Sequence, residues 1–227
     1  IIFLIYNFNL SGSLTLAEIR GIFFHGMKMD LSLISYLMVF PGIVLSFSFL
    51  CTPKVLSTIL KIYTYFLLVI ITCLNILDLG LYPHWGTRVG ISAFDYIGDP
   101  QGFFSSIMLK DVFAAIAVIL FYGILFTWLF NRFLKKGIKD AAHQKWFYFP
   151  VMLLITAFLI IPIRGGLGTS PINLSTVSFS SKLYVNQATY NFMWNFFKTV
   201  ERKKALKNPC NYSDKEQAYK KFNLFES

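Results

Sequence analysis

The stretch VFAAIAVILFYGILFTWLFN, residues 112–131, contains no charged residue and is bounded by Asp111 and Arg132. Its length matches the roughly 20 apolar residues that a helix needs to cross the hydrocarbon core of a bilayer. A charge at the centre of a span costs about 2.5–3.5 kcal/mol on insertion scales. An uncharged window of this length therefore indicates a membrane-spanning helix.

Similar apolar windows recur along the chain. Residues 31–53 and 146–163 carry no charge. Residues 62–77 are also uncharged, and this apolar window extends past Asp78 to residue 81. Residues 1–10, IIFLIYNFNL, are typical of the last part of a further span. The pattern predicts an all-α integral membrane protein with about five transmembrane helices, the first incomplete, in a domain covering residues 1–163.

The overall composition agrees with this prediction. The chain has 227 residues, of which 56% are hydrophobic and 14% are charged. A soluble domain has roughly 25% charged residues, and it needs a polar exterior. The composition excludes an ordinary soluble domain, a disordered tail and a disulfide-rich secreted module.

The basic residues predict the orientation. The loops 51–61 and 131–145 contain seven lysines and arginines, whereas the longer loops 11–30 and 82–111 contain four, together with five acids. Basic loops remain on the cytoplasmic side. We therefore expect the N-terminus inside and everything after residue 163 outside.

Residues 164–227 differ in character and form the second predicted unit, an extracytoplasmic juxtamembrane linker. It begins with a segment rich in Gly, Ser and Pro, typical of irregular chain. Between 190 and 204, polar and apolar residues separate on two helical faces, and Trp194 lies beside a basic cluster. This pattern suits an amphipathic helix at a membrane interface, although a linker helix packed on a neighbouring domain fits equally well.

Few side chains suggest chemistry. Asp78 lies near the outer end of its span, where anchoring of a loop or helix end is favoured over proton transfer. Trp85, like Trp194, is typical of an interfacial aromatic residue. Arg88 has the geometry to hold a lipid phosphate by two hydrogen bonds. Arg164, at the end of the last span, is either a snorkelling residue or a headgroup contact.

The usual catalytic motifs are missing. The sequence contains no G-x-S-x-G, H-E-x-x-H or P-loop pattern. No cluster of acids and histidines suggests a metal site, so we assign no catalytic and no metal-binding residue and expect no cofactor in this segment. Nucleic-acid binding is not expected, because the basic residues lie beside the spans or in the outer tail.

Three stretches carry a family resemblance: GMKMDLSLISY (26–36), LYPHWGTRVGISAFDYI (81–97) and the long stretch from IPIRGG to FMWNF (161–196). Together they resemble the membrane domain of lipoteichoic-acid-synthase-like proteins of the sulfatase/alkaline-phosphatase superfamily. The matching positions are Gly26, Lys28, Asp30, Ser32, Tyr82, Pro83, Trp85, Gly86, Arg88, Arg164, Gly165, Gly166, Pro171, Ile172, Asn173, Asn186 and Asn191.

The resemblance implies a bacterial cytoplasmic (inner) membrane protein that continues after Ser227 into an extracytoplasmic catalytic domain with a threonine nucleophile and Mn or Mg. Such a domain moves phosphoglycerol or a similar group from a phospholipid to a polymer or glycan. This chain would then be its membrane anchor, with membrane phospholipid and its own catalytic domain as partners. Arg164, Arg88 and Lys28 are the expected lipid-phosphate contacts, and Gly165, Gly166, Pro171 and Asn173 shape the juxtamembrane stretch. The alternative is a free-standing multi-pass protein: a transporter subunit, an envelope scaffold or a lipid-binding module.

Overall fold

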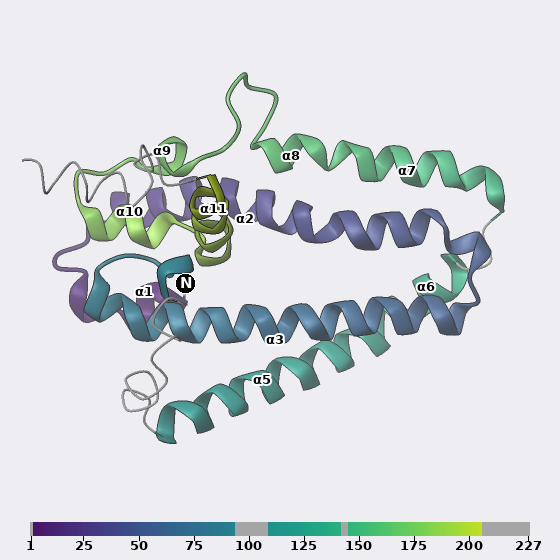
Figure 1. The fold of residues 1–227 in the computed structure, drawn as a ribbon, viewed down its shortest axis with the longest axis horizontal. Helices are drawn as coiled ribbons and strands as arrows, with labels where there is room; N and C mark the ends of the chain where they lie inside the picture. Colours follow the sequence, from purple (N-terminus) through teal and green to yellow (C-terminus); the bar gives the residue numbers. More distant parts are fainter. Residues whose placement is uncertain (1, 94–108, 142–144, 206–227) are drawn as a thin grey trace, which may run out of the picture.

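The computed structural model describes residues 2–93, 109–141 and 145–205, and all regular structure in these ranges is helical (Figure 1). The elements are α1 (Ile2–Tyr6), η1 (Phe8–Leu10), α2 (Leu16–Ser46), η2 (Ser48–Leu50), α3 (Pro53–Trp85), α5 (Leu109–Leu129), η4 (Phe130–Leu134), α6 (Lys135–Ala141), η5 (Trp146–Tyr148), α7 (Phe149–Phe158), α8 (Ile160–Arg164), α9 (Leu174–Val177), α10 (Leu183–Thr189) and α11 (Phe192–Ala205).

Four helical segments in the described part of the chain are long and apolar enough to cross a membrane. They are Leu16–Ser46, Pro53–Trp85, Ile116–Ala141 and Trp146–Arg164. These segments confirm an all-helical, multi-pass membrane protein. At the expected span 1–10, the described residues form only the five-residue α1 and the three-residue η1, which are too short to cross a membrane.

The helix ends differ from the predicted boundaries because local caps decide them. α2 begins at Leu16 rather than Leu31, since the Thr15 hydroxyl accepts from the Glu18 N–H while the Glu18 carboxylate accepts from the Thr15 N–H. This capping box satisfies backbone donors that the first turn leaves unpaired. α2 ends at Ser46 rather than Pro53, because Pro53 opens α3 as a first-turn proline behind its cap, Thr52.

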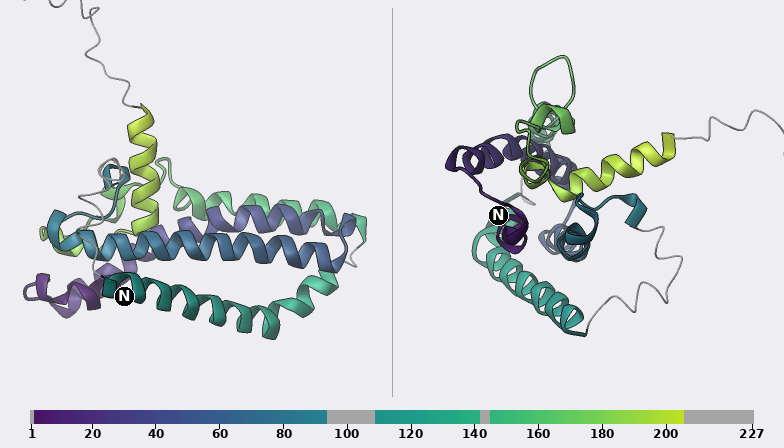
Figure 2. Two further views of the ribbon diagram at one scale, coloured as in Figure 1. Left: turned by 60° about the horizontal axis from the view of Figure 1, so that its bottom comes forward. Right: turned by 90° about the vertical axis from the view of Figure 1, so that its left-hand side faces the viewer.

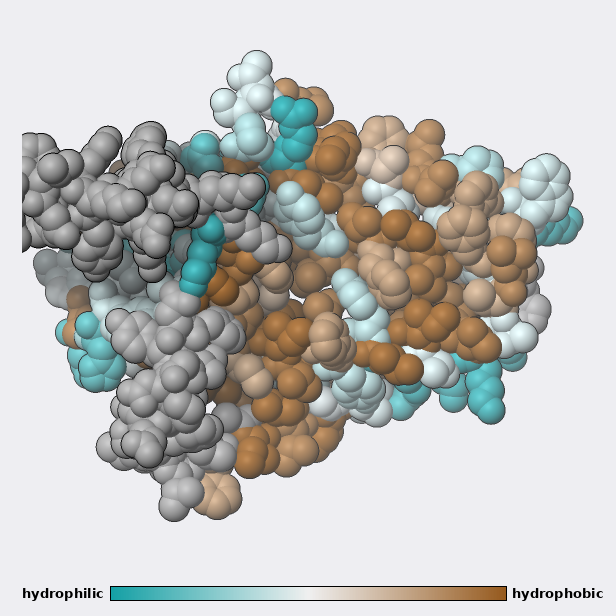
Figure 3. Space-filling view, viewed as in Figure 1, coloured by the Kyte–Doolittle hydropathy of each residue, from teal (hydrophilic) through white to brown (hydrophobic). Residues whose placement is uncertain are grey.

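The spans pack as two pairs. α2 lies along α7 and α8, while α3 lies along α5, and the Tyr63 hydroxyl joins the pairs by donating to the Leu37 carbonyl at 2.7 Å (Figure 1). Apolar residues cover much of the visible face of the bundle (Figure 3). Exposed side chains on α5 include Ile124 and Phe121. A surface of this kind is expected of helices that face lipid.

Residues 165–205, here called the cap, fold back over one end of the bundle. They contain α9, α10 and α11, which all contact α2. Met29, Ile172, Val177 and Trp194 form the buried core between α2 and the cap. α11 runs across the long direction of the bundle, as the left panel of Figure 2 shows. We call this the capped end, and the end with the α2–α3 and α6–α7 connections the basic end.

Candidate functional site

A buried ion pair lies where α3 reaches the cap. The Asp78 side chain is fully buried, and its Oδ2 lies 3.2 Å from Nη2 of Arg88, whose side chain is only 5% exposed. The other carboxylate oxygen, Oδ1, accepts a hydrogen bond from the Val89 N–H at 2.8 Å. Asp78 therefore holds the segment 86–93 against the end of α3, which confirms the loop-anchoring interpretation of this residue.

The Arg88 guanidinium is only partly satisfied. It lies 4.0 Å above the ring of Phe3, while its Nε and Nη1 are buried without a hydrogen-bond partner among the described residues. Asp78 Oδ2 is within ion-pair distance but lacks hydrogen-bond geometry, so this contact is electrostatic. Burial lowers the pKa of Arg88, and the neighbouring Asp78 opposes that shift.

The cap contacts the backbone of segment 86–93 through three polar side chains. Gln187 Oε1 accepts from the Arg88 N–H at 3.2 Å, and Asn195 Nδ2 donates to the Val89 carbonyl at 3.0 Å. Thr199 Oγ1 accepts from the Ile91 N–H at 2.8 Å. These bonds join α10 and α11 to the end of α3, so the cap and the spans form one connected unit.

Gly86 allows the chain to reverse direction after α3. It follows α3 with φ +65°, and its N–H bonds the Tyr82 carbonyl at 2.8 Å. Glycine adopts the left-handed conformation that ends a helix at little cost, because it has no Cβ. The reversal of the chain at Gly86 brings Arg88 back beside Asp78 on α3.

Three aromatic rings complete the surroundings of the pair. Phe3 packs edge-on against Tyr82, with ring centroids 4.6 Å apart, and contacts Tyr184 at 5.9 Å. The Tyr184 hydroxyl donates to the Asn7 carbonyl at 3.1 Å. Burial raises the pKa of Tyr184, and Arg88 opposes this shift. These contacts hold α1 against the ion pair and the cap.

A pocket of about 240 Å³ lies beside the pair, between segment 86–93 and the cap. The Thr87 and Ser92 hydroxyls line it and make no hydrogen bond to the described residues. The full lining consists of Trp85, Thr87, Arg88, Gly90, Ser92, Leu174, Gln187, Tyr190, Asn195 and Thr199. The pocket offers hydroxyl and amide groups to a polar ligand.

Arg164 and Lys28 lie at the capped end as well, but both are exposed. Arg164 Nη2 donates to the Thr169 carbonyl at 3.3 Å. The Ser32 hydroxyl donates to the Ile163 carbonyl at 2.8 Å, which fixes the end of α8 against α2 one turn from Lys28. Arg88, in contrast, is buried, so the three basic residues do not form one surface cluster.

The juxtamembrane residues shape the turn that leads from α8 into the cap. Gly165 and Gly166 have φ +83° and +129°, and the Ile172 N–H bonds the Arg164 carbonyl at 2.9 Å across the loop. Pro171 is exposed just before the buried Ile172. Asn173 caps α9 by accepting from the Thr176 N–H at 3.0 Å.

The two tryptophans occupy different environments. Trp85 is half-buried and lines the pocket of about 240 Å³. Trp194 is only 6% exposed and belongs to the core between α2 and the cap. Lys198 Nζ lies 5.4 Å from its ring centre. The indole of Trp194 thus packs against protein, and Phe197, at 51% exposure, is the apolar side chain that α11 presents outward.

No group of three or more His, Cys, Asp or Glu side chains able to hold a metal ion occurs within residues 2–93, 109–141 and 145–205. No family model, curated protein or solved structure matches this chain.

Proposed function

We propose that this chain is the membrane-anchor domain of an extracytoplasmic phosphoglycerol-transferase or sulfatase-like enzyme that acts on lipid headgroups. The observation that carries the proposal is the cap, because it packs on α2 and α3 and is hydrogen-bonded to the segment that follows α3, at one end of the apolar bundle. α11, its last described helix, runs across the bundle direction (Figure 2). A domain that follows α11 would be held close to the membrane surface.

The proposal includes the orientation of the chain in the membrane. The basic end, with seven lysines and arginines in residues 51–61 and 131–145, faces the cytoplasm of a bacterial cell. The capped end then faces outward, where lipid headgroups of the outer leaflet lie. Tethering a catalytic domain there raises its effective concentration toward a lipid substrate.

The exposed basic residues of the capped end have the clearest access to lipid phosphates. Arg164 and Lys28 are exposed beside the end of α8 and on α2. Arg88 faces the ring of Phe3 and the carboxylate of Asp78, so a phosphate would reach it only through the adjoining pocket. We therefore rank Arg164 and Lys28 as the outer contacts and Arg88 as the inner one.

Two experiments test the proposal. The coding sequence after Ser227 should encode a domain with a threonine nucleophile among Asp, Glu and His metal ligands, and a stop codon there would contradict it. In the whole enzyme, Arg164→Ala should lower turnover of a phospholipid donor but spare a soluble phosphoester. Arg20→Ala, which removes another exposed charge from the capped end, is the matched control. Equal loss on both substrates, or no loss, would refute the role of Arg164.

A further inference from the structure

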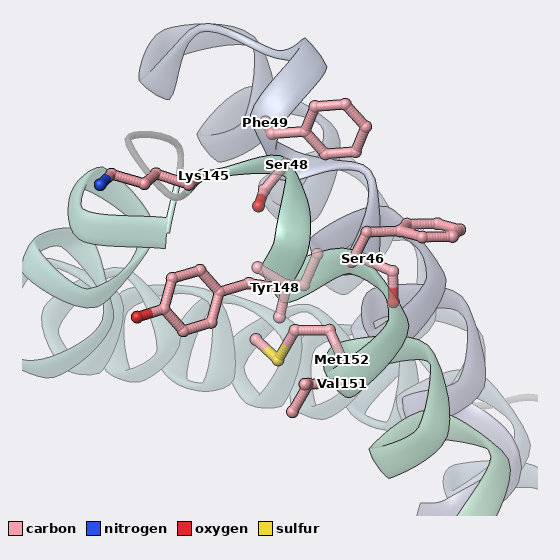
Figure 4. Close-up of a pocket in the computed structure, with 9 residues that line it drawn as sticks. Ser46, Ser48, Phe49, Lys145, Tyr148, Val151 and Met152 are labelled. Carbon is pink, nitrogen blue, oxygen red and sulfur yellow. The ribbon is translucent and has the colours of Figure 1, made fainter.

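A second pocket lies at the basic end, far from the Asp78–Arg88 pair. It occupies about 100 Å³ where the end of α2 and η2 meet η5 and the start of α7 (Figure 4). Its lining is mostly apolar and consists of Leu45, Ser46, Ser48, Phe49, Lys145, Tyr148, Phe149, Val151 and Met152. The pocket lies between the ends of two membrane-spanning helices, where lipid surrounds the protein.

The polar groups of this pocket divide into two kinds. The Ser46 hydroxyl donates to the Gly42 carbonyl at 2.8 Å, and the Ser48 hydroxyl donates to the Ala141 carbonyl at 2.9 Å, so both hydroxyl protons are used. Lys145 is exposed and forms no ion pair with a described residue, and Tyr148 is 43% exposed. Figure 4 shows the ammonium of Lys145 and the hydroxyl of Tyr148 on the same side of the pocket, away from Phe49.

The surroundings of Lys145 and Tyr148 have the composition of a membrane interface. Trp146 and Phe147, between them in the chain, are 74% and 49% exposed, and exposed aromatic residues of this kind collect at headgroup level. Residues 51–61 and 131–145 at the same end also contain Lys54, Lys61, Arg132, Lys135, Lys136 and Lys139, against the single acid Asp140. This charge complements an anionic lipid surface.

We propose that this pocket binds one anionic phospholipid from the leaflet at the basic end. The phosphate would lie between the Lys145 ammonium and the Tyr148 hydroxyl, which both donate hydrogen bonds to it. An acyl chain would descend along Val151 and Met152, which line the apolar part of the pocket. The proposal requires only that the four helices span a membrane, so it stands or falls independently of the proposed enzymatic function.

The test measures retention of single lipids by the whole chain in detergent, using native mass spectrometry with phosphatidylglycerol and with phosphatidylcholine. Lys145→Gln should weaken phosphatidylglycerol binding about fivefold, as expected for one lysine at an anionic headgroup. Lys54→Gln is the matched control, because it removes an exposed lysine from the same end outside the pocket lining. It should weaken retention much less than Lys145→Gln does, because its attraction to the lipid is diffuse.

Two further measurements distinguish binding in this pocket from diffuse electrostatic attraction between the lipid and the basic end. Met152→Trp should fill the apolar part of the pocket and reduce retention of the same lipid without altering charge. Inorganic phosphate should fail to displace the lipid, since it lacks an acyl chain. The proposal is overturned if Lys145→Gln and Lys54→Gln weaken binding equally, if phosphatidylcholine is retained as well as phosphatidylglycerol, or if inorganic phosphate competes.

Discussion

Among the described residues, Asp78 is the one carboxylate within salt-bridge distance of the Arg88 guanidinium, whose side chain is only 5% exposed, and replacing Asp78 with Asn removes that partner. The amide oxygen of Asn can still accept from the Val89 N–H, so the substitution isolates the charge. An unpaired buried charge costs about 3–5 kcal/mol. We expect Asp78→Asn to lower the free energy of unfolding by about that amount, because two nitrogens of Arg88 already lack hydrogen-bond partners in the described ranges.

The double variant gives the sharper test. Arg88→Met alone leaves the Asp78 carboxylate buried without its cation, so it should also destabilise by about 3–5 kcal/mol. When Asp78→Asn and Arg88→Met are combined, neither charge remains and the Met side chain can pack on Phe3. The double variant should therefore lie within about 1–2 kcal/mol of the wild type, since buried pairs contribute little net stability.

The assay is SDS-induced unfolding in mixed micelles, followed by tryptophan fluorescence, to which Trp194 in the cap core contributes together with Trp85, Trp128 and Trp146. The exposed Lys198–Glu201 pair, with 2.7 Å between Nζ and Oε2, provides the control. Glu201→Gln, which removes the more exposed partner and leaves the contact of Lys198 with Trp194 in place, should produce no measurable change, because surface pairs add little. The reasoning is refuted if either buried single variant costs less than about 1 kcal/mol, or if the two costs simply add in the double variant.

Three other predictions follow from local geometry. Thr15→Ala should cost about 1 kcal/mol and speed amide hydrogen exchange in the first turn of α2, because it removes the capping box; unchanged exchange would contradict this. Gly165→Ala should lower the thermal midpoint, since φ is +83° and the new Cβ would lie 2.8 Å from Ile172 Cβ, whereas Gly168→Ala meets open space and should not; equal effects would refute the distinction. Asn195→Ala should loosen segment 86–93, seen as faster exchange at the Ile91 N–H than in the wild type, because α11 loses its bond to the Val89 carbonyl; equal rates would oppose this.

The spans were predictable, because an uncharged apolar window of this length is compatible with few structures besides a membrane-spanning helix. The ends of the spans were harder to predict. The T-L-A-E pattern at 15–18 is nevertheless a capping-box signature, and it would have placed the start of α2. The charge-based boundary at Asp30 failed because α2 extends beyond the apolar window to a part on which the cap packs, and there Asp30 Oδ1 accepts from Asn191 Nδ2 at 2.7 Å.

The partnership of Asp78 and Arg88 depends on tertiary structure. Gly86 signals the end of α3, but nothing in the sequence says that the chain turns back toward Asp78 rather than away from it.

The helix α11 was also predicted only in part. The 190–204 pattern predicted an amphipathic helix, and α11 spans Phe192–Ala205. Its polar Asn195, however, is 8% exposed and bonds segment 86–93, because a polar face can be buried wherever backbone carbonyls accept its hydrogen bonds.

The most direct test of the account is the sidedness of the two bundle ends. Single cysteines would be introduced as Lys135→Cys at the basic end and Thr169→Cys in the exposed loop of the capped end, in a chain whose Cys51, Cys73 and Cys210 are replaced by Ser. With a membrane-impermeant maleimide on intact cells, the account predicts labelling at 169 immediately and at 135 only after the membrane is permeabilised. Labelling of both positions in intact cells, or of 135 alone, would contradict it.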